Sequence, residues 1–119
     1  MVYKIGNVAD LDMIPLIDDT ALELLLHYAR VLTIEYGENR NIDEDDGGFL
    51  IYAPSGTPTE EIKACFDYTK HCVESVDRFG DLLAATYILK NEFAVTIILS
   101  MADAPTEILN ELDERNENQ

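Results

Sequence analysis

The sequence predicts a small α+β domain with a mostly antiparallel sheet of three or four strands and helices packed mainly on one face. Hydrophobic residues make up 47% of the 119 residues, which is enough for one core. Helix-start signals alternate along the chain with short apolar runs of strand composition. We therefore expect a single domain over 1–119, in the order helix, strand, helix, hairpin, helix. An uncertain extended segment precedes Pro15.

The first helix is predicted over about 20–34. Thr20 and Glu23 have the spacing of a capping box, in which the two side chains bind the free amides of a first helical turn. Gly37 then provides a stop. Residues 31–36 also have strand composition, so this segment remains open between helix and strand. The apolar residues that recur at helical spacing are Leu22, Leu25, Leu26, Ala29 and Leu32.

An acidic loop is predicted over 37–48, where Ile42 is the only apolar residue. Long loops in small domains are often functional or mobile, and we expect this one to be flexible. Its carboxylates are the densest in the chain and are our candidate partner-binding residues. They are Glu38, Asp43, Glu44, Asp45 and Asp46.

The same loop partly resembles a calcium-binding loop. Asn41, Asp43 and Asp45 lie at alternate positions, as oxygen ligands do in an EF-hand. The pattern then fails, because Asp46 occupies the position that needs glycine and Tyr52 the position that needs a bidentate Glu. A solvated acidic loop is the preferred interpretation, and weak divalent-cation binding stays open. We assign no metal ligand.

A strand over 49–53 and a helix over 58–72 follow. The strand is a short apolar run closed by Pro54. Thr57 has the place of an N-cap, followed by Pro58 at the first helical position and Glu60 three residues after the cap. The apolar face of this predicted helix is Ile62, Cys65, Phe66, Thr69 and Val73.

Residues 83–90 and 93–101 form the clearest predicted hairpin, with Asn91 in the turn. One face of this hairpin is fully apolar and should be covered by helices. The other is semi-apolar, so it is either partly covered or used for self-association. In the second case we expect a homodimer whose interface contains Ile88, Ile98 or Leu50.

The last helix is predicted over 104–113, after Asp103 and Pro105, with a frayed tail over 114–119. Its apolar stripe is short, because only Ile108, Leu109 and Leu112 supply it.

The two cysteines are predicted to be reduced. On one continuous helix, Cys65 and Cys72 would lie about 10.5 Å apart along the axis, too far for a disulfide. Cys72 adjoins His71, but zinc needs four converging ligands, and the other histidine, His27, belongs to a different helix. A Cys–His nucleophile is disfavoured as well, because acidic surroundings raise a thiol pKa.

No enzyme signature is present. The Gly-rich segments 47–48 and 54–58 match neither phosphate-binding pattern, and Ser55 lacks the context of a hydrolase nucleophile. The acid pairs at 18–19 and 60–61 are explained by helix starts, where the dipole favours anions. We therefore assign no catalytic residue and no cofactor.

Net charge is the most unusual property of the chain. Twenty-four acidic and eight basic residues give −16, spread evenly along the sequence. Such a charge opposes direct nucleic-acid binding and attracts basic partners. We expect an acidic interaction or inhibitor module of the nucleic-acid-mimic or immunity type. Two alternatives stay open: a structural or oligomerising domain whose charge serves solubility, and a small enzyme or ligand-binding protein.

The expected location is cytoplasmic. No apolar run approaches the roughly 20 residues of a membrane span. The first 15 residues also lack the basic start and apolar centre of a secretory signal.

Overall fold

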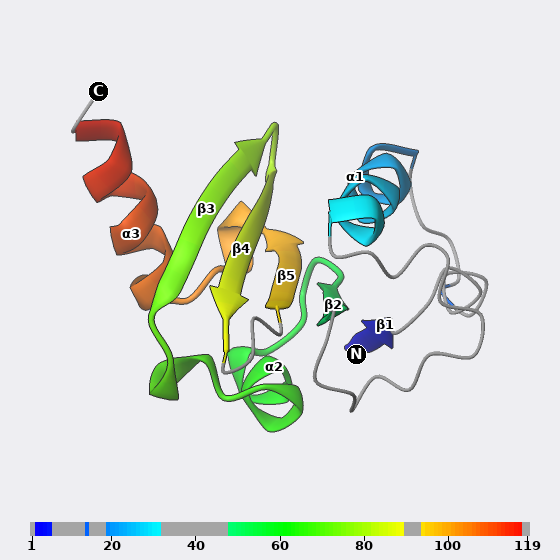
Figure 1. Ribbon diagram of the computed structural model, residues 1–119, viewed down its shortest axis with the longest axis horizontal. Helices are drawn as coiled ribbons and strands as arrows, with labels where there is room; N and C mark the ends of the chain where they lie inside the picture. The colour runs from blue at the N-terminus through cyan, green and yellow to red at the C-terminus, as the bar shows by residue number, and fades with distance from the viewer. Residues whose placement is uncertain (1, 6–13, 15–18, 32–47, 90–93, 118–119) are drawn as a thin grey trace.

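Five strands form one mixed sheet in the spatial order β1-β2-β5-β4-β3, with three helices around it (Figure 1). The computed structural model describes residues 2–5, 14, 19–31, 48–89 and 94–117. The strands are β1 (Tyr3–Ile5), β2 (Gly48–Ala53), β3 (Val73–Phe79), β4 (Leu82–Ile88) and β5 (Ala94–Ser100). The helices are α1 (Asp19–Val31), α2 (Thr59–Cys65) and α3 (Thr106–Glu117). The predicted α+β class is confirmed.

Most strand pairs are antiparallel, and one is parallel. The predicted hairpin is confirmed as the antiparallel pair β4–β5, although its turn at Asn91 lies outside the described residues. β2 runs parallel to β5, from Gly48 opposite Ala94 to Ala53 opposite Leu99. β1 pairs with β2 at one edge of the sheet, and β3 pairs with β4 at the other.

The helices cover both faces of the sheet. α1 packs on one face, which we call the α1 face, through Leu24, Leu25 and Tyr28. Ile62 of α2 and Ile108 of α3 join the core on the opposite face. Two of the three helices thus share one face, as predicted. In Figure 1, α1 lies beside β2 and α3 lies beside β3, so the two helices lie toward opposite lateral edges of the sheet.

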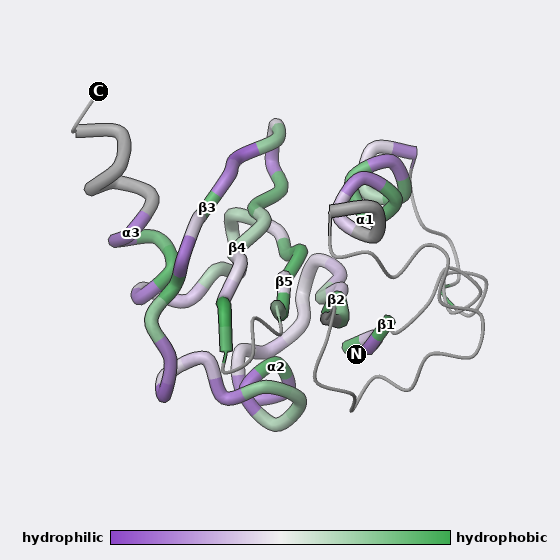
Figure 2. The backbone as a smooth tube through the Cα atoms, viewed as in Figure 1, coloured by the Kyte–Doolittle hydropathy of each residue, from purple (hydrophilic) through white to green (hydrophobic). Residues whose placement is uncertain are grey.

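β5 is the centre of this core because both of its faces are buried. Val95, Ile97 and Leu99 point to the α2/α3 face, and Ile98 points to α1. Figure 2 shows β5 as mostly hydrophobic, whereas α1 alternates between hydrophobic and hydrophilic stretches. Burying one such aliphatic side chain contributes about 1.5–3 kcal/mol.

The semi-apolar sheet face is therefore largely covered within the chain. Leu50 and Ile98, two of the residues expected in a dimer interface, are fully buried on the α1 face. Of the three, only Ile88 is exposed, at 47%. Thr86 and Thr96, also on this face, bond to each other through their hydroxyl oxygens at 2.9 Å, which satisfies two buried polar groups.

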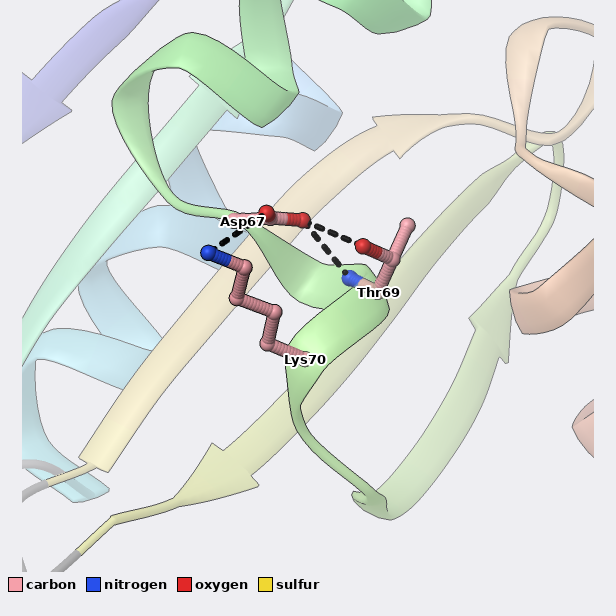
Figure 3. Close-up of polar contacts among 3 residues, drawn as sticks. All are labelled: Asp67, Thr69 and Lys70. Atoms are coloured by element: carbon pink, nitrogen blue, oxygen red, sulfur yellow. Dashed lines mark hydrogen bonds and ion pairs between the residues drawn. The ribbon is translucent and has the colours of Figure 1, made fainter.

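The predicted helix over 58–72 is wrong in its second half. α2 ends at Cys65, Phe66 takes an extended conformation, and a 3₁₀ turn follows at Tyr68–Lys70 (η2). Asp67 caps this turn, because its carboxylate accepts hydrogen bonds from the Thr69 amide at 3.2 Å and hydroxyl at 2.5 Å (Figure 3). These bonds lower the pKa of Asp67 below its usual value.

β3 follows this turn and was not predicted. Its exposed side chains are mostly polar, as suits the edge of a sheet, and a bulge interrupts its pairing between Val73 and Ser75. Gly80 joins β3 to β4 with φ +63°, a conformation that favours glycine. β3 and the short β1 raise the sheet from the predicted three or four strands to five.

The residues predicted to cap the helices have other positions or other hydrogen bonds in the structure. Thr20 lies inside the first turn of α1, which begins at Asp19. Thr57 donates its hydroxyl to the Pro54 carbonyl at 2.6 Å, and Pro58 is the residue before α2. Asp103 accepts a hydrogen bond from the Gly56 amide at 2.8 Å.

The ends of the other predicted elements shift by a few residues. α3 starts two residues later than predicted and runs to Glu117, so 114–117 are helical. α1 is described as far as Val31, and the question over 31–36 otherwise lies outside the described residues. The strands predicted over 83–90 and 93–101 are Leu82–Ile88 and Ala94–Ser100, and Met101 begins a 3₁₀ turn.

None of the helices in the described part of the chain is both long enough and apolar enough to cross a membrane.

Candidate functional site

The strand order brings three chain segments together at one end of the sheet. Because β2 and β5 are parallel, their C-terminal residues Ala53 and Ser100 reach the same end. β4 is antiparallel to β5, so the β3–β4 turn lies there too, with Leu82 opposite Ser100. The Met101 amide donates to the Asp81 carbonyl at 2.8 Å and ties the turn to the end of β5.

A hollow of about 570 Å³ opens at this end, between the strand ends and the first turn of α1. A smaller hollow of about 240 Å³ shares Thr20 and Phe79 with it and continues along α1 to His27. We call the two together the α1 groove. Its wider part is lined by Thr20, Tyr52, Ala53, Ser55, Phe79, Gly80, Asp81, Leu82 and Ser100, and its narrower part adds Glu23, Leu24 and His27.

The dimensions of the groove suit a segment of chain. From Thr20 to His27 the helix advances about 10 Å, which is close to the length of three residues of extended peptide. The combined volume lies in the range of ordinary ligand sites, roughly 300–1,000 Å³.

The wider part of the groove has a mixed polar and apolar lining, the narrower part is mainly apolar, and each part includes one carboxylate. Asp81 and Glu23 are exposed, and neither side chain has an ion pair or hydrogen bond within the described residues. Among the described residues, no lysine or arginine lines the groove. Arg78, next to the turn, donates from Nε to the Gly80 carbonyl at 3.0 Å. Within the part of the chain that the structure describes, the two groove carboxylates thus have no neutralising cation.

Phe79 lines both parts of the groove and is 38% exposed. It packs against the Tyr28 ring at 6.4 Å between centroids, with the rings at 83°. The Tyr28 hydroxyl donates to an Asp77 carboxylate oxygen at 2.9 Å. Burial, followed by this hydrogen bond and the Asp77 charge, raises the pKa of Tyr28 well above its usual value. The bond holds α1 and β3 together on either side of the groove.

The partner-binding residues predicted from the sequence are not among the described residues. Glu38, Asp43, Glu44, Asp45 and Asp46 lie outside the described residues, as does Asn41 of the calcium-like pattern. Within the described residues, no group of three or more His, Cys, Asp or Glu side chains is placed to hold a metal ion.

The cysteines and histidines are separated by the fold. Cys65 and Cys72 are free thiols, and burial raises the pKa of Cys65. His71 stacks on Phe66 at 5.0 Å, on the α2/α3 side of the sheet. His27 lines the groove on the α1 face. The two imidazoles therefore lie on opposite sides of the sheet.

Carboxylates dominate the described surface. Eleven acidic and four basic residues have described side chains, a net charge of −7 with histidine neutral, and none of them is buried. Four cations cannot neutralise eleven anions, so the potential around this part of the molecule is negative.

Comparisons of the chain with known protein families, with curated proteins and with solved structures found no match.

Proposed function

We propose that this chain is an acidic protein-interaction domain that binds a basic segment of a partner protein in the α1 groove. One observation carries the proposal: Asp81 and Glu23 line a groove that also exposes the Phe79 ring, and neither carboxylate has an ion pair within the described residues. A lysine or arginine of the partner would supply the missing positive charge. The exposed Phe79 ring would cover its aliphatic stem.

The net charge of −16 supports the same conclusion at longer range. A negative potential steers basic proteins toward the domain and raises their association rate, most strongly at low salt. The carboxylates at 43–46 remain part of this proposal as a source of steering. The α1 groove provides the short-range contacts that distinguish one basic segment from another.

A binding experiment with defined peptides tests the proposal. Twelve-residue peptides with three basic, no charged or three acidic residues are titrated with the protein at 0.15 M salt, and fluorescence anisotropy reports the dissociation constant. We expect only the basic peptide to bind. Replacing Glu23→Gln and Asp81→Asn together should weaken binding by about tenfold, which corresponds to 1.4 kcal/mol.

The matched control is Glu60→Gln with Glu107→Gln, which removes the same charge from exposed sites on α2 and α3. It should change the dissociation constant less than twofold. In a third variant, Asn or Gln replaces the four acidic residues at 43–46. This variant should bind the basic peptide with a lower association rate at low salt. Equal weakening by the groove and control variants would show non-specific attraction and overturn the assignment to the groove.

Self-association is the second candidate, and Ile88 is the observation that favours it. This residue is 47% exposed on β4, on the face that the sequence predicts for a homodimer. Single exposed apolar residues are common on monomers, so the support is smaller than for the groove. Light scattering of the parent protein and of Ile88→Asp at high concentration tests it, and a monomer in both cases would exclude it.

A further inference from the structure

Phe79 packs against a side chain that is itself held by a hydrogen bond. Tyr28 packs on it nearly at a right angle, and Asp77 fixes the Tyr28 hydroxyl. The ring therefore keeps its orientation while its remaining surface lines both parts of the α1 groove. A fixed, partly exposed aromatic ring is a suitable platform for a flat cation.

Residues with hydrogen-bond acceptors line the same groove from several elements. Asp81 follows Phe79 across the turn, and Glu23 comes from α1. Three hydroxyl-bearing residues, Thr20, Ser55 and Ser100, line the wider part of the groove, and the Ser100 hydroxyl already accepts a hydrogen bond from the Ala102 amide. The chain's own nearby arginine, Arg78, bonds to the Gly80 carbonyl, which is consistent with a turn surface that accepts guanidinium donors.

Arginine and lysine differ in how they use such a site. Guanidinium is planar, is weakly hydrated, stacks on aromatic rings and has five donors in a fixed plane. Lysine ammonium is a compact and strongly hydrated charge with three donors. A stacking ring with spread acceptors favours the first, whereas carboxylates alone would accept both.

We propose that the α1 groove selects arginine over lysine in the partner segment, an inference that rests on the proposed function. The guanidinium group stacks on the Phe79 ring and donates hydrogen bonds to the carboxylates of Asp81 and Glu23. The ligand class is therefore an arginine-containing peptide segment.

Three peptides that differ at a single position test the selectivity. They have arginine, lysine or citrulline, a neutral group of arginine-like shape, within an otherwise uncharged sequence. We expect the arginine peptide to bind about fivefold more tightly than the lysine peptide, which is the size of a cation–π contact of about 1 kcal/mol. The citrulline peptide should bind more weakly than either.

The variant Phe79→Leu keeps an apolar side chain and removes the ring. It should reduce arginine binding to the lysine level and leave lysine binding within twofold. The control Ile88→Leu alters the other strongly exposed apolar residue and should change neither. If Phe79→Leu does not fold, NMR of the parent protein supplies the readout, because ring stacking shifts the arginine Cδ protons upfield.

The outcomes separate the two proposals. Equal binding of arginine and lysine peptides, or an arginine peptide whose Cδ protons do not shift, overturns the selectivity and leaves the proposed function standing. Failure of every basic peptide to bind the parent protein overturns the proposed function itself.

Discussion

Tyr28 is the residue that links α1 to the edge of the sheet, through its 2.9 Å bond to Asp77. Its pKa is raised, so the folded state favours the neutral phenol. The corresponding stability is fully present below about pH 10, the ordinary tyrosine pKa, and is lost as the pH rises further. We expect urea denaturation to show a fall in the free energy of unfolding between pH 9 and 11.

The variant Tyr28→Phe separates the hydrogen bond from burial. It should lower the free energy of unfolding by about 1 kcal/mol at pH 7 and reduce the alkaline loss. The control is Tyr87→Phe. Burial is the main cause of the raised pKa of Tyr87, and this hydroxyl has no hydrogen bond in the described residues. Tyr87→Phe should reduce the alkaline loss without the penalty at pH 7. Equal stability of Tyr28→Phe and the parent would show that the Asp77 bond contributes nothing.

The residues of the α1 groove could not be found by their chemistry in the sequence. A search for dense carboxylates selects 43–46, whereas Glu23 and Asp81 are single acids in ordinary surroundings. Both line the α1 groove because β2 and β5 are parallel and α1 begins at the same end of the sheet. One local signal existed: Gly80 and Asp81 form a turn dipeptide between two stretches of strand composition.

At the scale of elements, apolar strands and the β4–β5 hairpin were predictable, and the boundary after α2 was not. Ile62, Cys65 and Phe66 fit a helical stripe, and Thr69 and Val73 extend it by chance. The pattern cannot show that Asp67 caps a new turn and that Phe66 leaves the helix to pack against Tyr87 at 5.2 Å. β3 was missed because an edge strand with one buried residue, Val76, lacks a strong alternation.

The β3–β4 hairpin depends on the conformation of Gly80. A Cβ atom at this position would meet no atom within 4 Å, so the cost of alanine is conformational only. Gly80→Ala should lower the free energy of unfolding by about 1 kcal/mol because L-residues disfavour positive φ. Gly80→Asn is the control, since asparagine tolerates this region, and should cost less. Chemical denaturation measures both, and equal costs would contradict the backbone explanation.

At the scale of the whole molecule, like-charge repulsion opposes folding. The net charge is −16, and the described surface has too few cations to pair with its carboxylates. Salt shortens the range of this repulsion to about 10 Å at 0.1 M and about 3 Å at 1 M. The thermal midpoint at pH 7 should therefore rise from 0.02 to 0.5 M sodium chloride. A fall would indicate that attractive ion pairs dominate instead.

The position of β2 has a consequence for the route to the native state. β3, β4 and β5 follow one another in the chain and can pair through local contacts. β2 lies in the first half of the sequence, so its pairing with β5 is a long-range contact. Until β2 pairs with it, β5, whose residues from Ala94 to Leu99 are all buried in the folded sheet, is an open edge. Refolding at high concentration is thus a competition between docking of β2 and recruitment of β5 by a neighbouring chain, so yield should depend on dilution.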